Sequence, residues 1–176
     1  MGCAERNVVA LVPTDAIRAI YDRSFRLAYE VTLREHELRT DLAVTNTSGE
    51  SLEFQALLHN YIRAPADEVL VTPLEGKTYY DKTEGTEGAK RETRAGVDVR
   101  GYTDAVYEEA GGTYVVGWGG GGVRVVGEGL KDVVVWNPQG PVGDLEEQGW
   151  CVGCGLGCGG ADRATGRGSC ALSRGT

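Results

Sequence analysis

His59 is the residue best suited to proton-transfer chemistry in this 176-residue sequence. On a predicted strand over residues 54–63 it shares one face with four others: Gln55, Leu57, Tyr61 and Arg63. This mixture of imidazole, amide, phenol and guanidinium is typical of a ligand-binding concavity rather than of a dry core. Histidine titrates near neutral pH and can therefore act as a general acid or base. Because a single histidine in a strand is more often structural, composition alone leaves both interpretations open.

Two further polar residues, His36 and Asp104, each have a plain structural alternative. His36 lies in the charged segment 34–37, which we expect to be a solvated turn. Asp104 follows Tyr102 and Thr103 in a polar segment, where an aspartate can serve simply as a turn former.

The cysteines gather at the end of the chain. Four of the five lie after Trp150: Cys151, Cys154, Cys158 and Cys170. Their spacing allows a zinc or iron–sulfur site. The stretch before Cys170 is rich in glycine and arginine, however, and lacks the apolar residues that pack around a small metal site. We therefore expect neither a metal nor another cofactor, and the cysteine-free body excludes a disulfide scaffold.

The elements that must position these residues are predicted to be strands. Residues 25–33 alternate between apolar and polar with a period of two, as in a half-buried strand. Further strand candidates are 38–46, 52–63, 68–72, 113–117, 123–126 and 132–137. Only Pro13 to Asp22 could form a short helix. Many strands separated by turns indicate an all-β sandwich.

Two polar or glycine-rich segments are predicted to connect these strands. Residues 83–96 contain almost nothing apolar and are expected to be a loop. Gly119 to Gly122 could be mistaken for a phosphate-binding loop, but such loops lead from a strand into a helix. Because a strand is predicted on both sides, a hairpin connection is favoured.

The composition divides the chain at residue 150. Residues 1–150 are acidic and β-patterned and are expected to form a partial sandwich domain. Residues 151–176 contain eight glycines and four cysteines without periodicity, so we predict a disordered tail. We hypothesise that the abrupt change reflects a reading-frame shift or a retained intron.

The charge and hydropathy of the chain exclude several classes of partner. The formal net charge of −8 argues against binding nucleic acid or an anionic membrane. No apolar run approaches the roughly 18 residues that span a bilayer, and the N-terminus lacks the apolar core of a signal peptide. We therefore expect a cytoplasmic protein, and a monomer.

Three segments resemble the glucose-6-phosphate 1-epimerase family, within the aldose 1-epimerase (galactose mutarotase-like) superfamily. They are Phe54 to Tyr61 with Gly76 to Lys82 after it, Thr103 to Tyr107, and Leu130 to Pro138. Their order and spacing match the family from about residue 15 to residue 150, although Ala105 replaces the usual arginine. The resemblance implies a galactose mutarotase-like supersandwich that is truncated at its N-terminus.

The resemblance also implies an isomerase that interconverts the α and β anomers of a hexose 6-phosphate. His59 corresponds to the catalytic histidine and Asp104 to a ligand of sugar hydroxyls. Histidine suits proton donation to the ring oxygen when the hemiacetal opens. We further hypothesise that Gln55 and Arg63 line the same cleft as His59.

Two parts of the family pattern are absent from the sequence. One is the N-terminal portion that carries the arginines for the substrate phosphate. The other is the glutamate base, which the family places at the end of a Cys-Val-Glu strand where this chain reads Cys151-Val152-Gly153. We therefore expect impaired turnover, and a non-catalytic carbohydrate-binding β-domain is the alternative.

Overall fold

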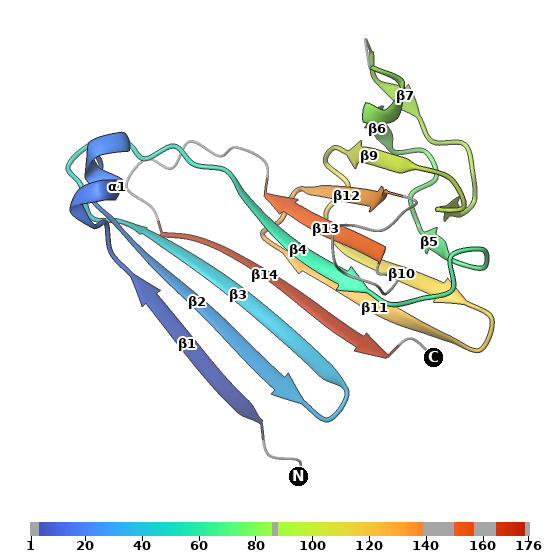
Figure 1. Ribbon diagram of the computed structural model, residues 1–176, viewed down its shortest axis with the longest axis horizontal. Helices are drawn as coiled ribbons and strands as arrows, with labels where there is room; N and C mark the ends of the chain where they lie inside the picture. The colour runs from blue at the N-terminus through green and yellow to red at the C-terminus, as the bar shows by residue number, and fades with distance from the viewer. Residues whose placement is uncertain (1–3, 86–87, 139–149, 157–164, 175–176) are drawn as a thin grey trace.

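The computed structural model describes residues 4–85, 88–138, 150–156 and 165–174, with the backbone alone for 150–156 and 165–170. These residues form two antiparallel sheets (Figure 1). The expected all-β sandwich is thereby confirmed. The one α-helix of the described residues, α1 (Asp15–Ile20), lies within the predicted helical segment, and the Thr14 hydroxyl caps it by accepting from the Ile17 N–H.

The larger sheet has eight strands in the order β1-β2-β3-β14-β11-β10-β5-β8. Their bounds are β1 Glu5–Leu11, β2 Phe25–Arg34, β3 Glu37–Asn46, β5 Leu70–Thr72, β8 Val97–Asp98, β10 Thr113–Trp118, β11 Gly121–Glu128 and β14 Thr165–Arg174. All five strands predicted for this sheet are present. Strand β1 was not predicted, because its residues are exposed on both faces and do not alternate between apolar and polar.

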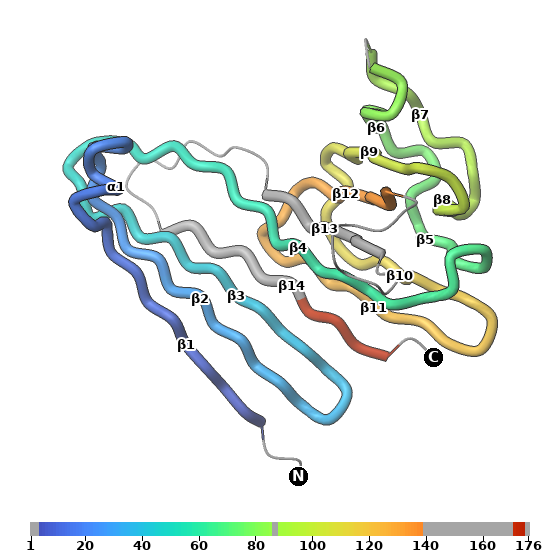
Figure 2. Tube along the Cα trace, in the orientation of Figure 1, coloured from blue at the N-terminus to red at the C-terminus, as the bar shows by residue number. Residues whose placement is uncertain are grey.

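The smaller sheet has six strands in the order β4-β13-β12-β9-β6-β7. Their bounds are β4 Ala56–Ile62, β6 Thr78–Asp81, β7 Lys90–Arg91, β9 Thr103–Tyr107, β12 Asp132–Asn137 and β13 Trp150–Leu156. Figure 2 follows the chain from the end of β3, past α1, into β4 of this second sheet. The strand predicted over 132–137 has these bounds in the structure, whereas the strand predicted over 52–63 is shorter.

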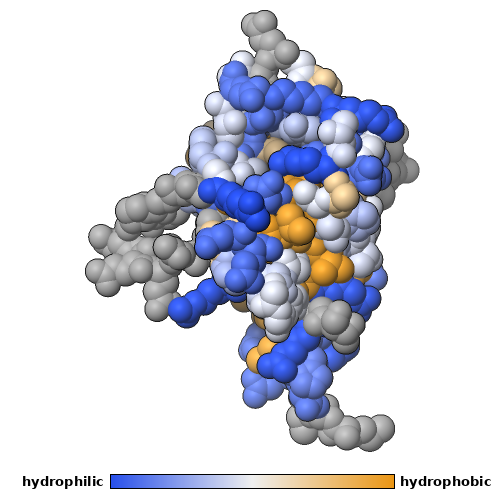
Figure 3. All heavy atoms as spheres, turned by 90° about the vertical axis from the view of Figure 1, so that its right-hand side faces the viewer, coloured by the Kyte–Doolittle hydropathy of each residue, from blue (hydrophilic) through white to orange (hydrophobic). Residues whose placement is uncertain are grey.

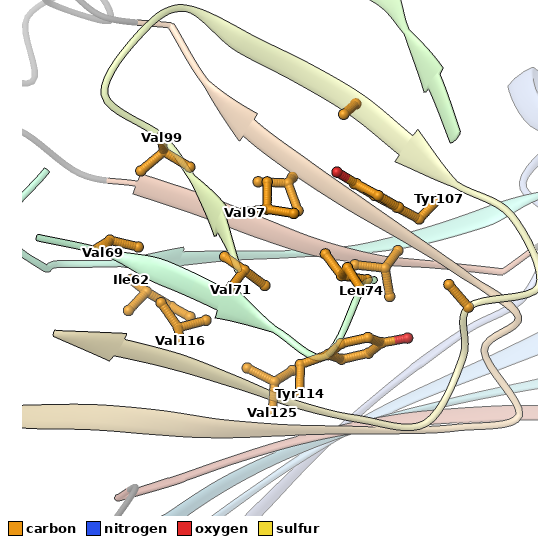
Figure 4. Packing of buried hydrophobic residues seen from close by; sticks show 14 of the residues in the cluster. Ile62, Val69, Val71, Leu74, Val97, Val99, Tyr107, Tyr114, Val116 and Val125 are labelled. Atoms are coloured by element: carbon orange, nitrogen blue, oxygen red, sulfur yellow. The ribbon is translucent and has the colours of Figure 1, made fainter. Parts of the chain in front are cut away.

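The core lies between the smaller sheet and one half of the larger sheet (Figure 4). The largest fully buried side chains come from both layers: Val71, Leu74, Val97, Tyr107, Tyr114, Val116, Val125, Val133 and Val135. On β12 the burial alternates strictly, so that Val133 and Val135 point into the core while Val134 and Trp136 point out. This alternation gives the smaller sheet one buried face and one open face.

The other half of the larger sheet, β1 with β2 and β3, extends away from this core (Figure 1). We call these three strands the wing. Its polar face carries ion pairs such as Arg6 with Glu30. The opposite face is mainly apolar, with Asn7 and Thr40 among its polar residues, and its apolar residues include Val9, Leu11, Leu27, Tyr29, Val31, Leu33, Leu38, Leu42 and Val44. Several of these side chains are exposed, Val9 at 65% and Leu33 at 51%.

Of the two predicted connections, the glycine-rich turn is confirmed and the loop over residues 83–96 is not. Gly119 and Gly120 form the turn between β10 and β11, with Gly120 at a φ of +91°, so the predicted hairpin is confirmed. Residues 83–96 are not a simple loop. This segment includes part of the 3-10 turn η1 (Lys82–Glu84) and all of β7, and its Glu92 is buried.

The predicted disorder of residues 151–176 differs from the structure wherever that segment is described. Strand β13 pairs with β4 and β12, and β14 pairs with β3 and β11. The sequence lacks strand periodicity because glycine supplies no side-chain pattern. Pairing still occurs, because the backbone of each strand forms hydrogen bonds with a neighbouring strand on both sides. The remaining tail residues, 157–164 and 175–176, lie outside the described residues.

The surface combines hydrophilic and apolar areas. Figure 3, which views the right-hand side of Figure 1, shows an apolar area at the middle of this face with hydrophilic regions around it. Leu70 of β5 and Val115 of β10 are among the exposed apolar residues of the molecule. Among the described residues, no helix has the length and apolar character required to cross a membrane.

Candidate functional site

Strand β4 presents His59 on the open face of the smaller sheet. Leu58 and Ile62 are buried at 8% and 5% exposure, whereas Leu57, His59 and Tyr61 are exposed. The His59 imidazole contacts the Tyr61 ring, with 5.9 Å between ring centroids. The His59 face of this strand therefore lies outside the core, while its role as a ligand-binding surface stays a prediction.

The strand register places Asp104 on the same open face. Asp104 of β9 pairs with Trp136 of β12, Trp136 pairs with Cys151 of β13, and Cys151 pairs with Tyr61. Directly paired residues in antiparallel strands project from the same face, as do residues two apart on one strand. His59 and Asp104 therefore face the same side. Asp104 lies within a strand, so its alternative as a turn former is wrong.

His59 and Asp104 are separated both across and along the sheet. Three strand spacings of about 4.8 Å lie between β4 and β9, and Asp104 is aligned with Tyr61, two residues from His59, so the two Cα positions lie about 16 Å apart. The surface between them is formed by β13 and β12. Its residues nearest to the two polar groups are Cys151, Gly153, Val134 and Trp136.

Gly153 is the direct cross-strand partner of His59. On its other side it pairs with Val134. This glycine occupies the position at which the Cys-Val-Glu pattern has its glutamate. A side chain at position 153 would project from the open face beside the His59 imidazole.

Gln55 and Arg63 lie immediately before and after β4, and both are exposed. Each is four residues from His59, or about 13 Å along an extended chain. Asp104 is aligned across the sheet with Tyr61, which lies between His59 and Arg63 on the chain, whereas Gln55 lies on the other side of His59. A ligand between His59 and Asp104 would therefore lie on the Arg63 side of His59, and the roles of Gln55 and Arg63 in ligand binding stay predictions.

No group of three or more potential metal-binding side chains occurs among the described residues. The cysteine cluster considered for zinc or an iron–sulfur centre has its side chains outside the described part of the chain. His36 lies in the turn between β2 and β3 with its side chain 63% exposed, as the sequence predicted.

A buried polar network on the opposite face of β9 was not predicted. The Glu92 carboxylate is 3% exposed and accepts two hydrogen bonds from the Arg94 guanidinium, at 2.9 and 2.7 Å, and one from the Tyr107 hydroxyl at 2.7 Å. The Arg94 hydrogen bond is the main cause that lowers the pKa of Glu92 to about 2. Burial first, and then Glu92, raise the pKa of Tyr107. This network faces the core, so we assign it a structural role.

Asn137 fixes the end of β12 beside Asp104. Its side chain is 2% exposed and donates to the Val99 and Gly101 carbonyl oxygens, at 2.5 and 3.3 Å. The segment 99–101 leads directly into β9. These bonds give Asn137 a structural role and hold Trp136 and Asp104 side by side.

Comparisons with known proteins identify the fold. No protein-family model matches the chain, and no curated protein matches it in sequence. A candidate mutarotase from Salmonella typhimurium is similar in structure, with a TM-score of 0.83 and 19% identity over 97% of this chain and 60% of that one.

Two further solved structures lead to the same fold. A candidate aldose 1-epimerase from Escherichia coli has a TM-score of 0.73 at 11% identity, covering 97% of this chain and 65% of that one. A galactose mutarotase-like protein from Lactobacillus casei has a TM-score of 0.74 at 11% identity, covering 97% and 70%. The chain thus spans less than two thirds of the first two of these proteins. It has the galactose mutarotase-like β-sandwich fold, over the part of that fold which it covers.

Proposed function

We propose that this chain is part of a hexose-6-phosphate mutarotase that interconverts the α and β anomers of glucose 6-phosphate. The observation that carries the proposal is the common open face of His59 and Asp104, whose Cα positions lie about 16 Å apart across strands β13 and β12. The resemblance of the three sequence segments and the fold of the solved neighbours support it.

The reaction requires two coordinated proton transfers. A base removes the proton from the anomeric hydroxyl while an acid protonates the ring oxygen, so that the C1–O5 bond breaks and a C1 carbonyl forms. Rotation about C1–C2 and the reverse transfers close the other anomer. His59 is the proposed acid, and Asp104 orients the sugar through charge-assisted hydrogen bonds to its hydroxyls.

The chain as it stands is expected to turn over slowly, because a glycine occupies the place of the base. Gly153, opposite His59, can neither accept nor donate a side-chain proton. This observation favours the second candidate function, a carbohydrate-binding β-domain that retains Asp104 and His59 as ligands. Anomer exchange followed by NMR separates the two candidates. Binding of glucose 6-phosphate without exchange above the spontaneous rate supports the binding domain.

The sharpest test restores the carboxylate. We expect Gly153→Glu to raise the exchange rate of glucose 6-phosphate by about 100-fold or more over the starting chain, the usual scale of one general acid–base group. The gain must disappear in the double variant that also carries His59→Gln.

Gly155→Glu is the matched control for this variant. Gly155 lies two residues further along β13 on the same face, opposite Leu57 rather than His59. It adds the same charge to the same strand, and we expect no gain. An equal gain from both substitutions, or a folded Gly153→Glu protein that binds the sugar without accelerating exchange, would contradict the assigned geometry.

A further inference from the structure

Between the two polar groups of the site, the open face of the smaller sheet is apolar. Trp136 is the direct partner of Asp104 on the adjacent strand, and Val134, on the same face of β12, pairs with Gly153. Neither residue offers a charged group to a sugar. The area between His59 and Asp104 therefore requires a ligand with an apolar surface of its own.

Trp136 is less exposed than Tyr61, the other aromatic residue among the directly paired positions Tyr61, Cys151, Trp136 and Asp104. Tyr61 is 59% exposed, whereas Trp136 is half-buried although it projects from the open face. Part of the indole is thus packed against its surroundings, and the remainder is accessible. Large aromatic side chains bury much apolar area, and their negatively polarised faces attract weakly positive C–H groups.

The backbone around Trp136 is held rigidly in place. The next residue, Asn137, is buried and hydrogen-bonded to the segment that precedes β9. Val135, the residue before it, is 0% exposed in the core. Both neighbours of Trp136 are therefore fixed, and its backbone cannot move away from Asp104 without disturbing the core.

We propose that the Trp136 indole forms the floor of the site and contacts the apolar face of a pyranose ring, whose hydroxyls donate hydrogen bonds to the Asp104 carboxylate. The proposal rests on the proposed function and makes its substrate class more specific. The ligand must be a closed six-membered sugar ring with axial hydrogens on one face, such as the hydrogens on C1, C3 and C5 of β-glucose 6-phosphate. Trp136 is a positioning residue in this arrangement and transfers no proton.

Saturation-transfer NMR with glucose 6-phosphate tests the contact directly. In the unmodified chain we expect the strongest saturation at the hydrogens on C1, C3 and C5. Trp136→Leu should weaken binding about tenfold and abolish this pattern, whereas Trp136→Phe should retain it because an aromatic face remains. Glucitol 6-phosphate, which has the phosphate but no ring, should bind the unmodified chain and the leucine variant equally weakly.

Tyr80→Leu is the matched control. Tyr80 of β6 pairs with Val106 and lies on the far side of β9 from His59. Its loss should leave binding unchanged. A second measurement, which does not depend on the leucine variant being folded, uses Trp118→Phe/Trp150→Phe, whose only tryptophan is Trp136. Its fluorescence should shift when glucose 6-phosphate is added and not when glucitol 6-phosphate is added.

The outcomes separate this inference from the function on which it depends. If the unmodified chain shows no saturation transfer from glucose 6-phosphate, both are overturned. If the sugar binds but its saturation pattern and affinity survive Trp136→Leu, or if the fluorescence of Trp136 does not respond, the indole floor is wrong and the proposed function stands.

Discussion

The two halves of the larger sheet have the same pairing but very different burial. On β10 and β11, Tyr114, Val116 and Val125 are at most 2% exposed because the smaller sheet covers them. On the wing, Val9 and Leu33 are 65% and 51% exposed although their strands pair in full register. Backbone pairing therefore defines the position of a strand, whereas stability depends on whether its apolar face is covered.

The two halves are also continuous. Leu38 of the wing pairs with Leu172 of β14, and Leu172 pairs with the fully buried Val125. One apolar face thus runs from the core onto the wing, where its cover ends. Substitutions of the same kind at the two ends should have different effects.

The largest difference is expected for leucine truncation. Leu74→Ala removes a side chain that is 0% exposed and should lower the free energy of unfolding by about 3 kcal/mol. Leu33→Ala, at 51% exposure, should lower it by less than about 1 kcal/mol. Urea unfolding of both variants measures the difference. Equal losses would mean that the apolar face of the wing is covered in solution.

The second largest effect on stability is expected for Glu92, whose carboxylate is buried beside the core. Glu92→Gln should lower the free energy of unfolding by about 2 kcal/mol at pH 7, because the charge-assisted hydrogen bonds from the half-exposed Arg94 guanidinium to the buried carboxylate are lost. The pKa of Glu92 is lowered to about 2 in the folded chain from an ordinary value of 4.5. Its contribution is therefore complete above about pH 4.5 and is lost as the pH falls toward 2.

Unfolding curves between pH 2 and pH 7 measure this dependence. The gap between the unmodified chain and Glu92→Gln should narrow steadily as the solution is acidified. Glu84→Gln is the matched control, because the Glu84 side chain is 64% exposed in its ion pair with Lys90. A gap that stays constant with pH would show that Glu92 is not ionised in the fold.

The smallest effect is expected on the polar face of the wing. Arg39 pairs with Asp41 at 3.1 Å and with Glu128 at 2.9 Å, and all three side chains are about a third exposed or more. Arg39→Gln should therefore lower the free energy of unfolding by less than about 1 kcal/mol, and salt should reduce that further. Thermal unfolding at low and high ionic strength measures it. A large loss that salt does not change would indicate a buried contact at this position.

The sequence predicted those features that depend on local pattern. Strand β12 and the polar face of β4 follow from alternation, and the turn at Gly119 and Gly120 follows from composition. The burial of Glu92 could not be predicted in this way, because its partner Tyr107 comes from another strand.

The relation between His59 and Asp104 required information that no single strand contains. It depends on the pairing of β4 with β13, of β13 with β12 and of β12 with β9. Strand β13 itself lies in a glycine-rich segment without a period-two pattern. Its place in the sheet is determined by its neighbours, so local sequence predicted disorder.

Gly153 also has a genetic consequence. Every glycine codon becomes an aspartate or glutamate codon through one substitution at its second base. The residue opposite His59 is therefore a single nucleotide away from a carboxylate. If the proposed chemistry holds, a single base change converts a chain that only binds the sugar into one that catalyses anomer exchange. Selection for anomer exchange from a library of single-base variants should therefore recover substitutions at position 153 first.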